Sequence, residues 1–148
     1  MNLCISNQNS LLSCSEHLDI SGNRISGTIP VGLGLLNNMI ELHIEENSLS
    51  GTIPSEFGLL TSSRIVSIHS NNLRGSVPSE IGALEKLEEF HMNDNIITGI
   101  IPNEMLNCAQ LKMLNLQNNE LSGVISSNIQ HLKALEICRY HFPLIIVA

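Results

Sequence analysis

The sequence is poor in aromatic and basic residues. It contains no Trp, and aromatic residues make up only 3% of its 148 positions. A buried core must therefore be built from aliphatic side chains, and little flat apolar surface is left for gripping a ligand by stacking. Lys and Arg number 7 against 14 Asp and Glu, which gives a formal net charge of -7. This balance argues against a nucleic-acid partner, whose phosphates need a face rich in Lys and Arg.

Signatures of metal binding and catalysis are also missing. The four cysteines, at positions 4, 14, 108 and 138, form no CxxC pair and no zinc-type Cys/His spacing. We therefore expect no metal and no other cofactor, and the spacing leaves disulfide pairing open. The chain contains no HRD or DFG kinase signature, no HExxH and no G-x-S-x-G elbow. These absences predict a chain without enzymatic activity.

Long apolar runs are missing as well. The opening segment, MNLCISNQNS, lacks the positive start and apolar stretch of a secretory signal. No segment approaches the roughly 18 apolar residues of a membrane span, and the closing PLIIVA is too short. The 43% hydrophobic content is nevertheless enough for a buried core. We expect a folded domain without a direct membrane span.

The sequence does contain a repeat with a period of 24 residues. Apolar residues stand five and three positions before a recurring Asn, and two and six positions after it. Gly follows that Asn by four positions in all five turns, and Pro follows by seven in every turn but the last, which has Ser126. A single turn cannot bury its own apolar side, so the turns must stack into a solenoid. The recurring residues are Asn23, Asn47, Asn71, Asn95 and Asn119.

Each column of the repeat has a physical interpretation. The L-x-L alternation before the Asn predicts a short strand that pairs in parallel with the next turn. The Asn side chain can satisfy inward backbone groups of its own turn and the next, which predicts an internal Asn ladder. Gly permits the bend, and Pro fixes φ for a short helical segment, in whose first turn Glu56 and Glu80 lie.

Further columns predict packing inside the helical side. Leu33, Phe57, Ile81, Met105 and Ile129 form one column. Leu36, Leu60, Leu84, Cys108 and Leu132 form the other. Because Cys108 replaces a Leu, it is interpreted as a small buried free thiol. The fragment GLGLLN is interpreted as architecture and not as a phosphate loop, because its second Gly repeats at positions 58 and 82.

The stretches LDISGNRISGTIP, LHIEENSLSGTIP, VSIHSNNLRGSVP and LNLQNNELSG resemble the L-x-L-x-x-N-x-L-x-G-x-I-P pattern of plant-type leucine-rich repeats. The resemblance covers residues 15–135 or so and extends to the ectodomains of plant leucine-rich-repeat receptor-like serine/threonine kinases. It implies a right-handed α/β repeat solenoid with a parallel concave sheet and short 3-10 or irregular convex segments. It also implies ligand or co-receptor recognition on the concave face, at the outer face of the plasma membrane or in the apoplast. The kinase domain of such a receptor lies outside this chain.

Three departures from the family pattern concern the two ends and the surface. Residues 1–14 are interpreted as a partial preceding repeat without a cap, in which Ile5 and Leu12 are in register with Ile29 and Leu36. Residues 15–136 form the solenoid, and residues 137–148 a degenerate sixth repeat or truncated tail, with a poor sixth strand expected over 137–140. No Asn is followed by x-Ser/Thr, so the glycosylation acceptors usual in this family are missing.

The residues between the buried strand positions should face solvent on the concave side. Four of the six His and most clustered acids fall there. A shared metal site is disfavoured, because His43 and His91 lie two turns, or about 10 Å, apart. An ordinary polar surface and a pH-sensitive recognition face both stay open, since imidazole titrates near neutral pH. The residues predicted to contact a ligand are Glu41, His43, Glu45, Glu46, His69, Glu89, His91 and Asp94.

The sequence therefore predicts a non-catalytic module that recognises a peptide or protein, with acidic contacts favouring a basic ligand. A co-receptor is a further expected partner by resemblance. One alternative is an enzyme inhibitor similar to the polygalacturonase-inhibiting proteins, which share the repeat. Another is a truncated gene product without an independent function.

Overall fold

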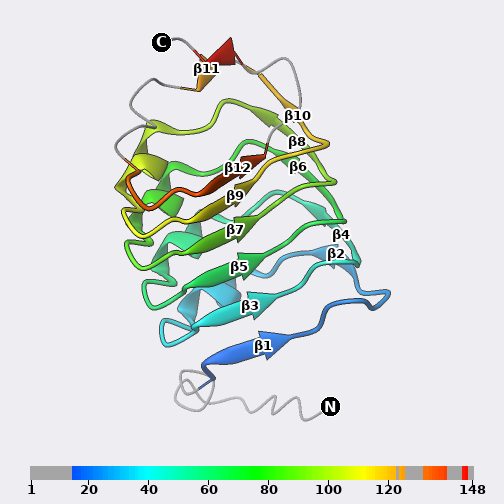
Figure 1. The fold of residues 1–148 in the computed structure, drawn as a ribbon. Coiled ribbons are helices and arrows are strands. Elements are labelled where there is room, and N and C mark those ends of the chain that lie inside the picture. The colour runs from blue at the N-terminus through cyan, green and yellow to red at the C-terminus, as the bar shows by residue number, and fades with distance from the viewer. Residues whose placement is uncertain (1–14, 123, 126–131, 140–144, 147–148) are drawn as a thin grey trace.

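The 24-residue periods form stacked turns of a solenoid in the computed structural model (Figure 1). The structure describes residues 15–122, 124–125, 132–139 and 145–146. The predicted fold class is confirmed: one parallel sheet lines the concave side, and short 3-10 helices line the other. The interpretation of residues 1–14 as a preceding half-repeat, and the column position of Ile129, lie outside the described residues.

The concave sheet is built from one strand of each turn. Every neighbouring pair is parallel and offset by 24 residues, so that Leu42 pairs with Val66 and Val66 with Phe90. These central residues are fully buried, while the residues on either side of them point outward. The strands, in sheet order, are β1 (His17–Asp19), β3 (Glu41–His43), β5 (Ile65–Ser67), β7 (Glu89–His91), β9 (Met113–Asn115) and β12 (Ile137–Arg139).

The Asn ladder forms, but it reaches in the opposite direction from the one predicted. Asn95 Nδ2 donates to the carbonyls of Met92 and Asn93 in its own turn and to that of Ile68 in the preceding turn, at 3.1–3.2 Å. Its Oδ1 accepts from the Leu73 amide at 2.9 Å. These bonds reach the preceding turn because the Ile68 carbonyl points toward the Asn95 side chain. Each Asn therefore joins its own turn to the one before it.

A second parallel sheet follows the Asn column, and the sequence did not predict it. Its order is β10-β8-β6-β4-β2, and it forms the flank of the solenoid. The Gly that ends β4, β6 and β8 has a positive φ, for example +80° at Gly51, which a residue with a Cβ rarely adopts. The strands are β2 (Ser26–Thr28), β4 (Ser48–Gly51), β6 (Asn72–Gly75), β8 (Ile96–Gly99) and β10 (Glu120–Leu121).

A 3-10 helix after the recurring Pro of each turn returns the chain to the concave sheet. These Pro residues have φ between -69° and -65°, as predicted for the residue that starts the segment. Glu56 and Glu80 do lie in the first turns. The helices are η2 (Val31–Leu35), η3 (Ser55–Leu59), η4 (Ser79–Ala83) and η5 (Asn103–Asn107).

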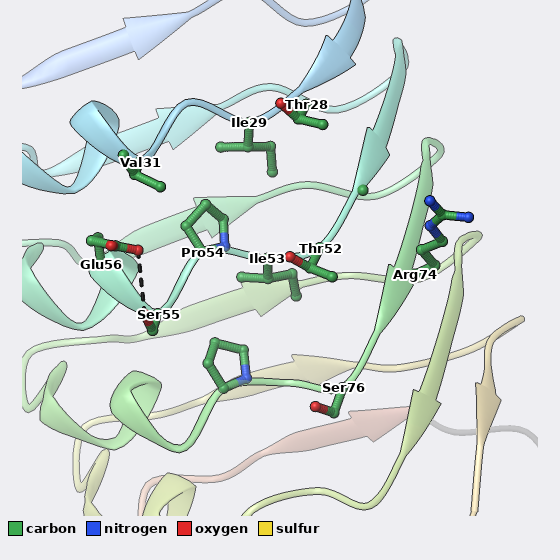
Figure 2. Close-up of a pocket in the computed structure, with 12 residues that line it drawn as sticks. Thr28, Ile29, Val31, Thr52, Ile53, Pro54, Ser55, Glu56, Arg74 and Ser76 are labelled. Atoms are coloured by element: carbon green, nitrogen blue, oxygen red, sulfur yellow. Dashed lines mark hydrogen bonds between the residues drawn. The ribbon is translucent and has the colours of Figure 1, made fainter.

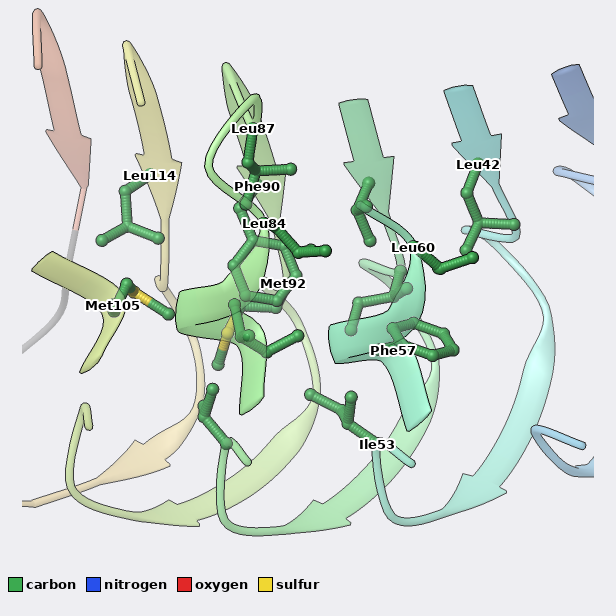
Figure 3. Packing of buried hydrophobic residues seen from close by; sticks show 14 of the residues in the cluster. Leu42, Ile53, Phe57, Leu60, Leu84, Leu87, Phe90, Met92, Met105 and Leu114 are labelled. Carbon is green, nitrogen blue, oxygen red and sulfur yellow. The ribbon is translucent and has the colours of Figure 1, made fainter. Parts of the chain in front are cut away.

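The core lies between the concave sheet and the 3-10 helices (Figure 3). Phe57 of η3 and Phe90 of β7 are the largest fully buried side chains, and the remaining core is mainly Leu, Ile and Met. A fully buried side chain of this size contributes about 1.5–3 kcal/mol of transfer free energy. The aromatic-poor composition therefore still yields a continuous core.

Cys108 occupies its predicted place in the Leu column and is a buried free thiol. Burial raises its pKa to about 11, so the thiol stays protonated near neutral pH. Cys138 of β12 is also free and partly buried, and burial raises the pKa of its thiol too. Near the end of the chain, β11 (Val124–Ile125) pairs in parallel with β13 (Ile145–Ile146) from the apolar closing run.

Candidate functional site

Three neighbouring strands place four of the eight predicted ligand-contacting residues in two rows across the concave face. Glu41, Ile65 and Glu89 share one register in β3, β5 and β7. His43 and His91 share the other, on either side of Ser67, which is buried with only 3% exposure. The sequence alternation sets this arrangement, because every second strand residue must face away from the core.

Carboxylates and imidazoles pair on two separate turns. His43 Nδ1 lies 3.2 Å from Glu45 Oε1, and its Nε2 lies 4.0 Å from Glu41 Oε2. Glu41 Oε2 also lies 3.1 Å from His17 Nδ1. On the other turn, His91 Nε2 lies 3.0 Å from Glu89 Oε2. The concave face therefore carries two acid–imidazole clusters separated by the apolar Ile65.

Glu45 keeps one carboxylate oxygen without a partner. Its Oε1 contacts His43, whereas Oε2 is buried and forms no hydrogen bond with any described residue. A buried acceptor without a donor is destabilising by about 1–3 kcal/mol.

The residue just before each ladder Asn has a left-handed backbone. The φ angles are 54° at Glu46, 52° at Ser70, 55° at Asp94 and 52° at Asn118. Asp94 accepts hydrogen bonds from Asn118 Nδ2 at 2.6 Å and Asn93 Nδ2 at 2.5 Å. These bonds, that from Asn118 first, lower the pKa of the Asp94 carboxyl. Asp94 therefore links two turns and is already engaged within the protein.

A small pocket of about 220 Å³ lies at the edge of the concave face where the strands begin. Glu41 and Glu89 flank Ile65 there, and Arg64 and Glu88 complete the lining. Glu88 contacts the Arg64 guanidinium and the Lys112 ammonium, the latter at 2.6 Å, and these bonds, that from Lys112 first, lower the pKa of its carboxyl. Glu88 shares its single negative charge between Arg64 and Lys112, while Glu41 and Glu89 bring two further carboxylates to the pocket.

The eight predicted contact residues do not form one cluster. Glu41, His43 and Glu45 come together on one turn, and Glu89 pairs with His91. His69 instead contacts the Ser70 hydroxyl at 3.0 Å, and Glu46 forms no ion pair within the described part of the chain. The prediction omitted His17 and the Arg64–Glu88–Lys112 row. That row was visible as a charged column at the 24-residue period, one position before each strand.

The concave face combines charged and polar side chains with one apolar side chain. Among the described residues, no group of three or more His, Cys, Asp or Glu side chains could hold a metal ion. No helix in the described ranges is long and apolar enough to cross a bilayer. What the face offers is a rigid array of carboxylates, imidazoles and amides around one apolar side chain.

The sequence model of the Leucine Rich Repeat family matches residues 15–36, 38–60, 86–108 and 110–132. These segments cover more than half of the chain. The chain belongs to the leucine-rich repeat family. The turn between the second and third matches carries the same Asn, Gly and Pro columns, and its strands β5 and β6 pair with both neighbours. Comparison with curated proteins gives no significant match.

Among solved structures, this leucine-rich repeat chain is similar to plant receptor ectodomains. The structure of PEPR1 with AtPEP1 is 35% identical with a TM-score of 0.85, over 91% of this chain and 19% of that one. The plant peptide hormone receptor RGFR1, in complex with RGF2, is 35% identical with a TM-score of 0.78, over 80% and 19%. The Arabidopsis receptor kinase HAESA, in complex with the peptide hormone IDA and the co-receptor SERK1, is 30% identical with a TM-score of 0.78, over 82% and 21%. The chain spans about a fifth of the length of these receptors.

Proposed function

We propose that this leucine-rich repeat chain is a non-catalytic recognition module whose concave face binds a basic peptide or a basic segment of a protein. Parallel strands hold the contacting side chains at fixed spacing, so an extended ligand is contacted by several turns at once. Because the strands are already ordered, little conformational entropy is lost by the protein on binding.

The pocket around Ile65 is the observation that carries this proposal. It combines an apolar side chain with two carboxylates, from Glu41 and Glu89, on its two sides. A Lys or Arg side chain fits this chemistry, because its methylene stem packs on an apolar residue while its charged head contacts carboxylates.

The similar receptors support a peptide as the ligand class. The titles of the RGFR1 and HAESA structures name complexes with peptide hormones, and that of HAESA also names a co-receptor. By this likeness we propose an extracellular location and a role in receptor signalling or defence, with a co-receptor as a second partner. A serine/threonine kinase domain of the full-length receptor belongs to the same proposal.

The test uses a lysine-rich decapeptide as the probe and isothermal titration calorimetry as the measurement. The double variant Glu41→Gln, Glu89→Gln removes both carboxylates while keeping side-chain size. We expect it to bind the probe about tenfold more weakly, since two solvent-exposed charged contacts of roughly 0.7 kcal/mol each are lost. Binding to the unmodified protein should weaken with added salt, because the pocket is open to solvent.

A matched double variant, Glu80→Gln, Glu104→Gln, serves as the control. Both carboxylates lie in 3-10 helices on the opposite side of the solenoid, and the change in net charge is the same. We expect its affinity for the probe to stay within about twofold of the unmodified protein. Equal losses in both double variants would show attraction by net charge alone, which would contradict a site on the concave face.

A further inference from the structure

A groove runs along the flank of the solenoid, between the second sheet and the 3-10 helices (Figure 2). Its volume is about 630 Å³. None of its lining residues belongs to the concave sheet, so it is separate from the face described above. Thr28, Thr52 and Ser76 occupy the same position of three successive turns along it.

The two threonines of this row are oriented by the glycines of the next turn. A Cβ placed on Gly51 would lie 2.9 Å from Thr28 Cγ2, and one on Gly75 would lie 2.9 Å from Thr52 Cγ2. Each methyl therefore occupies the space that its glycine leaves free. The hydroxyls of Thr28, Thr52 and Ser76 form no hydrogen bond with another described residue, and a spaced row of donors and acceptors is left unused.

Arg74 of β6 supplies the one positive charge among the groove-lining residues. Its side chain is exposed, and it forms no ion pair with any described residue, unlike Arg64 on the concave side. A guanidinium carries five N–H donors in a planar fork that matches a carboxylate. This cation stands out because the whole chain has a formal net charge of -7.

The opposite side of the groove is acidic and its floor is apolar. Figure 2 shows Glu56 across the groove from Arg74, with the Ser55 hydroxyl donating to Glu56 Oε2 at 3.3 Å. Ile29 and Ile53, each 4% exposed, form the floor together with Pro54. The groove is therefore complementary to a ligand with a carboxylate at one end, an apolar middle and a hydrogen-bond donor at the other end.

We propose that this groove is a second docking site, which binds an extended segment of a partner protein with an acidic residue at Arg74 and a basic residue at Glu56. The three free hydroxyls contact the backbone amides and carbonyls of the segment, and apolar side chains pack over Ile29 and Ile53. A polyuronate sugar fits less well, because it brings a carboxylate on every ring to a groove with a single cation and no aromatic side chain.

The experiment measures binding of the hexapeptide Asp-Asp-Leu-Ser-Leu-Lys to the full chain by isothermal titration calorimetry at low ionic strength. The reference peptide, Asn-Asn-Leu-Ser-Leu-Lys, lacks the acidic anchor. We expect Arg74→Glu to weaken binding of the acidic peptide about tenfold or more and to leave the reference peptide unchanged. Thr52→Val, which keeps the methyl toward Gly75 and removes the hydroxyl, should weaken binding of both peptides about threefold.

Lys86→Glu is the matched control, because Lys86 is exposed, forms no ion pair with a described residue and lies outside the groove. It should change the affinity for the acidic peptide by less than about twofold. Equal losses for Arg74→Glu and Lys86→Glu, or no binding of the acidic peptide to the unmodified chain, would overturn the proposal. Arg74-dependent binding of a galacturonate oligomer without binding of the peptide would overturn the assignment of the partner as a protein.

Discussion

At the residue scale, the ladder Asn joins neighbouring turns through several side-chain hydrogen bonds to the backbone. Asn95 is 7% exposed and bonds to four backbone groups through both ends of its amide. Replacing it leaves the buried Leu73 amide without its partner, whereas each of the three carbonyls keeps one other donor. The turn-to-turn contact, and not only the local bend, depends on this side chain.

We predict that Asn95→Ala lowers the free energy of unfolding by about 2–4 kcal/mol, as measured by urea unfolding followed by circular dichroism. Asn23→Ala is the control, because Asn23 is exposed and, among the described residues, its side chain bonds only to Ile20 and Ser21 of its own turn. Asn23→Ala should lower the free energy of unfolding by less than about 1 kcal/mol. Equal costs for the two variants would mean that the ladder does not join the turns.

The two glycines of the fragment GLGLLN belong to different columns of the repeat: Gly34 recurs as Gly58 and Gly82, whereas Gly32 does not recur as Gly. A Cβ on Gly58 would lie 2.5 Å from the Glu80 carbonyl oxygen, whereas a Cβ on Gly32 would have no atom within 4 Å. At Gly58, two successive 3-10 helices approach each other closely, and the Glu80 carbonyl has no room to move. Gly32 instead faces open space.

We therefore expect Gly58→Ala to destabilise the protein by about 1–3 kcal/mol through overpacking. Gly32→Ala should stay within about 0.5 kcal/mol of the unmodified protein. Thermal denaturation of both variants provides the measurement. A neutral Gly58→Ala would show that the spacing between successive turns is looser than in the structure.

At the scale of elements, the turn after each concave strand depends on a left-handed residue whose side chain differs from turn to turn. At Asp94 this residue also accepts hydrogen bonds from Asn118 and Asn93, which lower its pKa from the ordinary value of 3.8. A carboxyl with a lowered pKa in the folded state adds stability above its unfolded pKa and loses it as the pH falls through the folded one. The turn should therefore weaken in acid.

We predict that the melting temperature falls between about pH 4.5 and pH 2.5, and that Asp94→Asn makes this fall shallower. Asn adopts a positive φ readily, as Asn118 does at the equivalent position, so the backbone of the turn is kept. Melting curves followed by circular dichroism across this pH range are the test. An unchanged slope in Asp94→Asn would show that the hydrogen bonds from Asn118 and Asn93 contribute nothing to stability.

The sequence predicts the elements that follow from the 24-residue period. It does not predict the elements that form only through contacts between turns. The concave strands, the Asn column, the 3-10 helices after Pro and the buried Cys108 could all be predicted, because each follows from a repeated residue type. The second sheet could not, since its strands contain mainly Ser, Gly and Leu, which do not favour β structure individually. Its ladder of hydrogen bonds arises only when equivalent turns stack. The ion pairs between Arg64, Glu88 and Lys112 were missed although these three residues recur in one column of the repeat.

At the scale of the whole molecule, stacking divides the surface into sides with different chemistry. The concave side gathers Glu41, Glu45 and Glu89 with their imidazole partners. The flank carries the unpaired Arg74 and a row of free hydroxyls. A solenoid of this kind presents both sides rigidly and at once, which suits a module that joins a ligand to a second protein. The central claim concerns the concave side, where a basic peptide is proposed to bind.

The most direct test is a titration of the isotope-labelled chain with the lysine-rich decapeptide, followed by the amide resonances in NMR spectra. The account predicts that the shifts concentrate in residues 41–46, 65–70 and 89–94, on three neighbouring turns of the concave face, and that they disappear in the Glu41→Gln, Glu89→Gln variant. Shifts confined to the flank or the 3-10 helices, or the same shifts in that variant, would contradict the account.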